Sequence, residues 1–239
     1  MARIRKIARK PELSKNYFLV DACFLANKYI PSAKSPNPLQ KQRIARCMDW
    51  SKEIDAQVKA GCARVYVPDI CIAEAFKVLA KKYYDEHWFT SAVDLNNARL
   101  RFRKEVCLPA STLRAANRKI AIHDISTNRD IILAVDRFYE GFLKYKLRVS
   151  LPDLIILATA KYIMDFYDIP KNSVQIITMD KALWEGSKKI SNVPHCYDPT
   201  RPADAASGCF NRNGNTPNKS LQLSPNALLR TINSSSVEL

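Results

Sequence analysis

The sequence is poor in the residues that build zinc sites and disulfide frameworks. It holds 3 histidines, far apart along the chain, and 7 cysteines without a Cys-x-x-Cys pair. Because a structural zinc site needs clustered Cys and His ligands, we predict none. An odd number of scattered cysteines within apolar stretches indicates reduced, mostly buried thiols, which is typical of a cytoplasmic protein.

Long apolar runs are also missing. The most apolar run, residues 154–160, is far shorter than the ~20 residues of a membrane-spanning helix, and Asp153 and Lys161 bracket it. The basic N-terminal segment MARIRKIARK is not followed by an apolar stretch with a small-residue cleavage site, so we expect no secretory signal. These absences predict a cytoplasmic protein without a membrane partner.

Acidic residues are few compared with basic ones. The 38 Lys and Arg outnumber the 23 Asp and Glu, which gives a net charge of +15. A surplus of this size favours a polyanionic partner, either nucleic acid or an anionic membrane surface. With 47% hydrophobic residues and only 5 glycines, the chain is neither disordered throughout nor collagen-like. Its 239 residues fit one α/β domain or two small ones.

Composition divides the chain into three parts. Residues 1–15 form a basic N-terminal arm, with six Lys or Arg against one Glu. Residues 201–239 are rich in Ser, Asn and Pro, which predicts a disordered or loosely attached tail. The folded domain is expected over residues 16–200, with a helical insertion around residues 85–119.

The folded domain alternates between strand-like and helix-like segments. Strands are predicted at residues 17–22, 63–67, 119–125, 174–179 and 193–197, and helices at 39–60, 70–84, 90–106, 127–144 and 151–167. Thr127 and Asp130 predict a capping box at the start of the fourth helix. Strands separated by helices indicate a mostly parallel sheet with helices on both faces. Ligands of such sheets bind beyond the carboxyl ends of the strands.

Four acidic residues from four separate segments are predicted to meet at this edge. Asp21 ends the first strand and Asp180 ends the fourth, while Glu74 lies early in the helix after the second strand and Asp153 in the first turn of helix 151–167. Carboxylates that lie close together repel one another unless a cation neutralises them. Since no Cys or His ligands accompany them, we expect that cation to be Mg²⁺ or Mn²⁺.

Each of the four acids also has a purely structural explanation. The acid after the first strand could turn back onto a backbone N–H, and the acid after the fourth could start a turn. Glu74 shares a helix face with Lys77 and Lys81, so an exposed ion pair would explain it. Ser150 and Asp153 fit a capping box. A shared site explains all four acids at once.

Four segments resemble, in order, the motif blocks of PIN domains. They read VDACFLA, VPDICIAEAF, SLPDLIILATA and IITMDKAL, and the resemblance spans about residues 17–197. The resemblance implies a three-layer α/β/α sandwich and metal-dependent cleavage of RNA. It also implies that Asp21, Glu74, Asp153 and Asp180 are the catalytic acids. Many members carry Ser or Thr after the first acid and a further Asp two residues after the last. This chain has Ala and Cys at the first place and Ala182 at the second.

The chemistry expected of such a site is phosphodiester hydrolysis. We predict that Asp21, Asp153 and Asp180 hold one or two Mg²⁺ or Mn²⁺ ions, which activate water and stabilise the leaving oxygen. Glu74 would complete a second metal position or orient the attacking water. Thr178, two residues before Asp180 on the same strand face, is a candidate to hydrogen-bond one of the metal ligands.

Basic and aromatic residues near these acids predict an RNA-binding surface. The candidates are Lys77, Lys81, Arg99, Arg101, Arg103, Lys104, Arg114, Arg118 and Lys119, with Tyr83, Tyr84, Trp88 and Phe89 available to stack bases. The alternative for the basic residues is a solvated helix face.

Three hypotheses on function remain open at this stage. The first is an endoribonuclease. The second is a catalytically weak or silent RNA-binding module on the same fold, which the alanine at position 182 favours. The third is a toxin whose activity an antitoxin protein holds down by covering the acidic pocket. The family resemblance also implies a homodimer.

Overall fold

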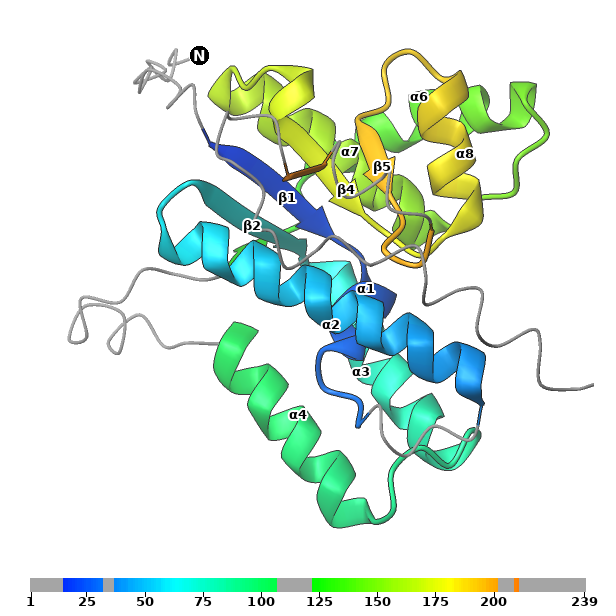
Figure 1. Cartoon of the computed structure of the whole chain (residues 1–239). Helices are drawn as coiled ribbons and strands as arrows, with labels where there is room; N and C mark the ends of the chain where they lie inside the picture. Colours follow the sequence, from blue (N-terminus) through cyan, green and yellow to red (C-terminus); the bar gives the residue numbers. More distant parts are fainter. Residues whose placement is uncertain (1–14, 32–36, 107–121, 202–208, 211–239) are drawn as a thin grey trace, which may run out of the picture.

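The computed structural model describes residues 15–31, 37–106, 122–201 and 209–210, and its centre is one sheet of five parallel strands (Figure 1). The strand order is β3-β2-β1-β4-β5. The strands are β1 (Asn16–Val20), β2 (Ala63–Pro68), β3 (Ile122–Ile125), β4 (Val174–Ile177) and β5 (His195–Tyr197). All four neighbouring pairs are parallel, so every strand ends at the same edge.

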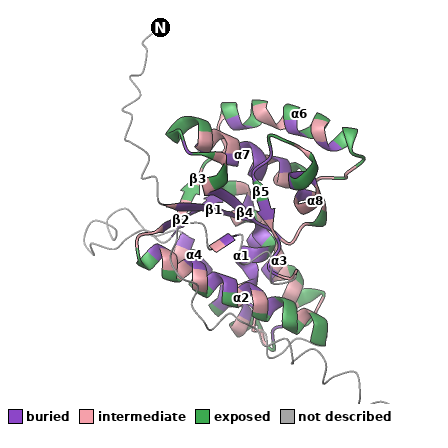
Figure 2. Ribbon diagram, turned by 45° about the horizontal axis from the view of Figure 1, so that its top comes forward, coloured by how far each residue is buried: buried purple, intermediate pink, exposed green. Residues whose placement is uncertain are grey.

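Helices cover both faces of the sheet and make three layers (Figure 2). On one face lie α1 (Ala22–Asn27), α2 (Pro38–Lys59), α3 (Asp69–Tyr84) and α4 (Ala92–Val106). On the other lie α6 (Arg129–Lys144), α7 (Leu151–Tyr167) and α8 (Lys181–Lys189), with a short 3₁₀ turn, η2 (Lys171–Ser173), before β4. The three-layer α/β/α fold predicted from the sequence is confirmed.

Burial on both sides explains why the central strands are almost wholly apolar. Every residue of β1 and of β4 is buried, including Phe18, Leu19 and Ile176 at 0% exposure. A parallel sheet between two helical layers has no solvent face, so its strands read as continuous apolar runs. Helix α7, the most apolar segment of the chain, packs against α6 and the sheet. The carboxyl edge of the sheet thereby stands on a rigid core.

The local predictions need three corrections. Residues 181–189 form helix α8 after Asp180, where no helix was predicted. Residues 22–27 form the short helix α1 directly after β1, where no helix was predicted. The capping box predicted for Thr127 and Asp130 is wrong, because Asn128 caps α6 by accepting a hydrogen bond from the Ile131 N–H. The Thr127 hydroxyl is instead engaged by Asp69, to which it donates at 2.5 Å. A contact between two distant elements therefore decides which of two adjacent polar residues becomes the cap.

Part of the predicted tail belongs to the folded core. The Cys209 thiol is fully buried and donates a hydrogen bond to Gln175 Oε1 at 2.7 Å. The Phe210 ring packs 4.9 Å from Trp50 and 6.1 Å from Phe18, centre to centre. The prediction of a loosely attached segment is wrong for these two residues. Residues 1–14 of the predicted basic arm, residues 107–119 of the predicted insertion, and residues 202–208 and 211–239 of the predicted tail lie outside the described residues. Within the described part of the chain, no helix is long and apolar enough to cross a membrane.

Candidate active site

The four predicted acids lie at the ends or starts of elements that meet at the carboxyl edge of the sheet. Asp21 follows β1 and caps α1, and Asp180 follows β4 and caps α8. Strands β1 and β4 are hydrogen-bonded neighbours, with Val20 level with Ile177. Asp153 is in the first turn of α7, and Glu74 is in the second turn of α3.

Asp21 is the most constrained of the four carboxylates. Its side chain is buried, and its Oδ1 accepts a hydrogen bond from the Phe24 N–H at 2.6 Å. Its Oδ2 accepts from the Thr178 hydroxyl at 2.6 Å and from the Met179 N–H at 3.1 Å. The Thr178 hydroxyl in turn accepts from the Asp180 N–H at 2.9 Å. One threonine therefore ties the first acid of the site to the backbone of the last.

Asp153 is turned toward the start of its own helix. Its Oδ2 accepts hydrogen bonds from the Ser150 hydroxyl at 2.5 Å and the Ser150 N–H at 3.3 Å. The Ser150 oxygen accepts from the Asp153 N–H, which completes the predicted capping box. Asp180 is itself the N-cap of α8, where its Oδ1 accepts from the Leu183 N–H at 2.8 Å. Local capping and turn hydrogen bonds therefore exist for three of the acids, as the structural explanation expected. These local bonds use only one oxygen of each carboxylate.

Burial and repulsion between carboxylates disfavour the ionised forms of Asp21, Glu74 and Asp153. Burial raises the pKa of Asp21 to about 6, with a smaller contribution from the charge of Asp153. Burial also raises the pKa of Asp153, and the charge of Asp180 adds to the effect. Burial and the Asp153 charge raise the pKa of Glu74, which Lys77 partly offsets. Asp153 therefore lies close enough to Asp21, Glu74 and Asp180 for their charges to interact.

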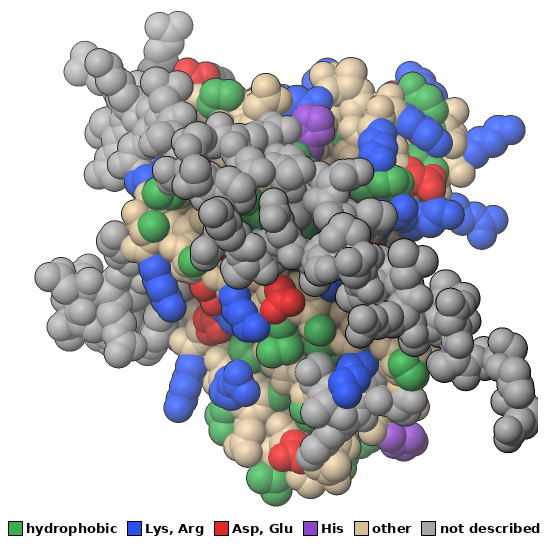
Figure 3. All heavy atoms as spheres, viewed as in Figure 1, with side chains coloured by type: hydrophobic (Ala, Val, Ile, Leu, Met, Phe, Trp, Pro, Cys, Tyr) green, Lys and Arg blue, Asp and Glu red, His purple; other side chains and the backbone are tan. Residues whose placement is uncertain are grey.

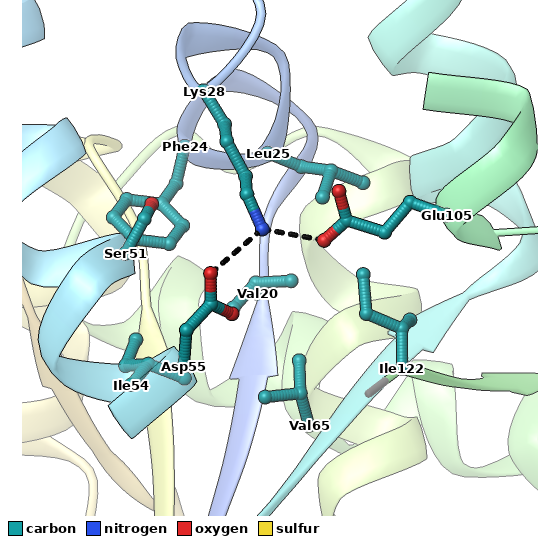
Figure 4. A pocket seen from close by; sticks show the side chains of 10 residues that line it. All are labelled: Val20, Phe24, Leu25, Lys28, Ser51, Ile54, Asp55, Val65, Glu105 and Ile122. Atoms are coloured by element: carbon teal, nitrogen blue, oxygen red, sulfur yellow. Dashed lines mark hydrogen bonds and ion pairs between the residues drawn. The ribbon is translucent and has the colours of Figure 1, made fainter. Parts of the chain in front are cut away.

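No cation neutralises this cluster in the part of the chain that the structure describes. The ion pairs there join other residues, and the pair predicted between Glu74 and Lys77 or Lys81 does not form. A second group of acids shows the contrast (Figure 4). There the Lys28 ammonium lies 3.1 Å from Asp55 and 2.5 Å from Glu105. Burial opposes the charge of that lysine, but the two carboxylates raise its pKa.

The oxygen ligands at this edge are of the type that a hard divalent cation prefers, but they are not arranged around a common point. Carboxylate and hydroxyl oxygens are the ligands that Mg²⁺ and Mn²⁺ take. Uncompensated acidic charge at one edge of a sheet also favours such a cation. Among the described residues, however, no three His, Cys, Asp or Glu side chains are gathered in a group that could hold a metal ion. The bonds of Asp153 to Ser150 and of Asp21 to Thr178 hold two of the carboxylates in other directions.

Cys23, in α1, is exposed and lies near the acids. Burial and the charges of Asp21, Glu74 and Asp153 together raise the pKa of its thiol to about 12. The acidic neighbours therefore make this thiol less acidic than an ordinary cysteine thiol.

The predicted RNA-binding residues fall into two groups. Lys77 and Lys81 are exposed on α3 beside Glu74, as expected. On α4, Arg101 and Arg103 are exposed, with their guanidinium groups 6.0 Å from the Tyr29 ring centre and 5.5 Å from that of Phe76, whereas Arg99 is half-buried. Arg114, Arg118 and Lys119 lie outside the described residues.

Two of the aromatic residues proposed to stack bases are core residues. Trp88 is 2% exposed and Phe89 is 5% exposed, so neither ring can meet a base, and that prediction is wrong for both. The Trp88 ring instead lies under the Lys82 ammonium at 4.0 Å. Tyr84 is 65% exposed and remains available. Trp88 and Phe89 lie in the loop between α3 and α4, where no periodic pattern separates core from surface positions.

Comparison with known proteins finds only distant structural similarity. No family model matches the chain, and no curated protein matches it. Among solved structures, FitAcB from Neisseria gonorrhoeae is 16% identical, with a TM-score of 0.44 over 77% of this chain and 99% of that one. VapBC2 from Rickettsia felis, bound to a DNA fragment from its promoter, is 10% identical, with a TM-score of 0.44 over 76% and 98%. FitAB bound to an IR36 DNA fragment is 15% identical, with a TM-score of 0.45 over 77% and 96%. Similarity at this level carries no conclusion about family or activity.

Proposed function

We propose that the protein is a metal-dependent endoribonuclease of the PIN type. The observation that carries the proposal is the acidic cluster at the carboxyl edge of the sheet. Asp21, Glu74, Asp153 and Asp180 reach this edge from four elements, and no cation pairs with them among the described residues. The basic surplus of the whole chain supports a polyanionic substrate around this acidic cluster.

The residues have distinct roles in this proposal. Asp21, Asp153 and Asp180 would hold Mg²⁺ or Mn²⁺, which when bound supplies an acidified water and neutralises charge on the leaving oxygen. Thr178 orients Asp21 through its 2.6 Å hydrogen bond. Glu74, whose pKa is raised, accepts a proton from the attacking water more readily than an ordinary carboxylate would.

Exposed lysines complete the site. Lys77 lies on the same helix as Glu74, one turn further along, and Lys81 follows one turn later. Both ammonium groups are free to contact a phosphate of the RNA strand that crosses the acids. Neither lysine pairs with an acid in the described part of the chain, so RNA binding at this face breaks no existing ion pair.

The test is metal-dependent cleavage of a fluorescent single-stranded RNA. Asp21→Asn, Asp153→Asn and Asp180→Asn should each lower the cleavage rate by more than the ~10–100-fold that loss of a metal ligand's hydrogen-bond partner costs. Asp165→Asn, which changes an exposed carboxylate on α7, is the matched control and should cleave normally. If all three site variants fold and cleave like wild type, the assignment is wrong.

A silent RNA-binding module is the second candidate. It is favoured by the lack of a preformed three-ligand group in the described chain and by Ala182 two residues after Asp180. It predicts RNA binding without cleavage at any Mg²⁺ or Mn²⁺ concentration. Isothermal titration with either ion separates the two candidates, because only the nuclease should bind the ion in an Asp153-dependent manner.

Toxin activity controlled by an antitoxin is a further part of the proposal. An inhibitory partner has to cover the acidic cluster, and a Lys or Arg side chain of that partner would neutralise it. Synthetic peptides that carry an arginine should then inhibit cleavage, whereas peptides with glutamine in its place should not. A homodimer and a cytoplasmic location remain predictions of the same hypothesis.

A further inference from the structure

The turn that joins α6 to α7 carries three cations and no acid. Lys144, Tyr145, Lys146 and Arg148 are all exposed, and we call these four residues the α6–α7 turn. None of the three cations forms an ion pair with another residue that the structure describes. A cation in the last turn of a helix is favourable, which accounts for Lys144. Arg148 lies four residues beyond the end of α6 and needs another explanation.

Lys146 occupies a backbone position that favours glycine. Its φ is 54°, in the left-handed region, where a β-carbon is unfavourable. The Lys146 N–H donates to the Leu143 carbonyl at 2.9 Å, and the Leu147 N–H donates to the Phe142 carbonyl at 3.0 Å. These two bonds form a Schellman motif, in which the residue at this place is usually glycine. A lysine that is unfavourable for the turn points to a use of its side chain.

Tyr145 presents an aromatic ring that nothing covers in the part of the chain that the structure describes. Its side chain is 48% exposed, and no second ring and no cation lies against it there. Trp184 on α8 shows the contrast, because Lys188 and Arg201 lie over that ring at 3.3 and 3.7 Å. The Tyr145 ring therefore remains accessible to a planar ligand.

The α6–α7 turn borders the acidic cluster. Arg148 comes two residues before Ser150, whose hydroxyl donates to Asp153, and two residues span at most ~7 Å. Helices α6 and α7 belong to the layer opposite to α3, which carries Lys77 and Lys81, so exposed cations flank the acids on both layers (Figure 2). On the side that carries α6 and α8, Lys and Arg side chains outnumber acidic ones, at the upper right of Figure 3.

We propose that the α6–α7 turn binds one nucleotide of single-stranded RNA beside the scissile phosphate, with the base on Tyr145 and phosphates on Lys146 and Arg148. The proposal rests on the proposed nuclease function for the identity of the strand. An unpaired base offers a π face to Tyr145, whereas an acidic peptide would engage the cations alone. A strand that reaches from the turn to Lys77 passes the acids. The turn thus positions the RNA and leaves the chemistry to the carboxylates.

The first measurement is the anisotropy of a labelled ten-nucleotide oligoribonucleotide in EDTA, where no metal-dependent cleavage occurs. Tyr145→Ala should weaken binding by about 5- to 150-fold, the range for loss of one stacked base. Tyr145→Phe keeps the ring and should retain most of the affinity. Tyr139→Ala is the matched control, because Tyr139 is 45% exposed and lies six residues earlier, on a different face of α6.

The second measurement separates a role in binding from a role in folding. Lys146→Gly should reduce the slope of log K against log salt by ~0.7, the value for one phosphate contact to a single strand. Its melting temperature should not fall, because glycine is favoured at this φ. Lys59→Gln should leave the slope unchanged, since Lys59 is an exposed lysine at the end of α2, where the sheet strands begin. A purely structural Lys146 would give a lower melting temperature and an unchanged slope.

The third measurement is the kinetics of RNA cleavage with Mn²⁺. Tyr145→Ala and Lys146→Gly should raise KM more than they lower kcat, because the turn holds the strand equally in the ground state and the transition state. A loss confined to kcat would place these residues in the chemistry instead and would contradict the proposal.

Further outcomes overturn the inference. Equal affinities of wild type and Tyr145→Ala, or equal salt slopes of Lys146→Gly and Lys59→Gln, would show that the strand runs elsewhere. Tyr145-dependent binding to phosphatidylglycerol vesicles, with RNA binding unchanged in Tyr145→Ala, would assign the turn to a membrane surface. If the variants lose RNA affinity but folded wild type cuts no RNA with Mg²⁺ or Mn²⁺, the nuclease proposal fails and the turn keeps its role. If wild type cuts RNA and both variants bind and cut equally well, the turn proposal fails and the nuclease proposal stands.

Discussion

The buried Asp21 carboxyl should make the protein less stable as the pH rises from about 4 to about 6. Burial raises the pKa of this group from its ordinary value of 3.8 to about 6 in the folded state. Between these values the folded protein retains the proton and the unfolded chain has released it. Unfolding then releases a proton, so raising the pH favours the unfolded state.

The size of the effect follows from the shift. A change of about 2 pKa units at ~1.4 kcal/mol each lowers the free energy of unfolding by as much as ~3 kcal/mol between pH 4 and pH 7. Burial raises the pKa of Asp153 and Glu74 as well, and these shifts act in the same direction. Asp69 acts in the opposite direction, because hydrogen bonds from Thr127 lower its pKa.

The assay is urea unfolding of wild type and Asp21→Asn at several pH values in EDTA. The variant keeps the shape of the side chain but cannot ionise, so the difference in unfolding free energy between the two proteins isolates this group. We expect the variant to gain stability relative to wild type as the pH rises through 4 to 6. Asp165→Asn, on the exposed face of α7, should show no such gain. If the difference in unfolding free energy does not change with pH, or changes with the opposite sign, the conclusion that burial disfavours the charged form of Asp21 is wrong.

Three further predictions concern the support of the site. Thr178→Val should destabilise the fold by ~2–4 kcal/mol in chemical denaturation, because Asp21 loses a short hydrogen bond and a backbone N–H loses its acceptor. Thr178→Ser keeps the hydroxyl and should cost only the ~1 kcal/mol of a buried methyl group. Gly186→Ala should cost ~1–3 kcal/mol in thermal unfolding, because an added Cβ would lie 2.4 Å from the Phe142 ring. Phe210→Ala should lower the melting temperature, since its ring packs on the core, and an unchanged value would show that this contact contributes nothing.

The sheet and its helices could be predicted because their signals are local and repeated. Apolar, β-prone runs alternate with helical segments, and this pattern alone implies a parallel sheet whose strands end at one edge. The short helix α1 was not predicted, because its six residues make fewer than two turns and are too few to show a helical period. Thr127 and Asn128 are both favourable N-cap residues by sequence, and only the contact of Thr127 with Asp69 decides which of them caps α6.

The site could be predicted in position but not in detail. The topology brings Asp21 and Asp180 to one edge, since Asp21 directly follows β1, Asp180 comes three residues after the end of β4, and the two strands are neighbours. The direction of the Asp153 carboxylate depends on its rotamer and its bond to Ser150, which spacing along the chain does not reveal. The contact of Trp184 with Arg201 depends on the path of the chain after β5, so no sequence pattern indicates it.

Cleavage of a mixed RNA pool with Mn²⁺ is the sharpest test of the proposal that the acidic cluster binds metal ions and cuts RNA. Wild type and Asp153→Asn are compared, with cut sites mapped by sequencing. Asparagine can still accept the hydrogen bond from Ser150, so the capping of α7 should survive the change. We expect discrete, Mn²⁺-dependent cuts by wild type and their loss in the variant. Identical cutting by both proteins, or no cutting by a folded wild type that binds the RNA, would contradict it.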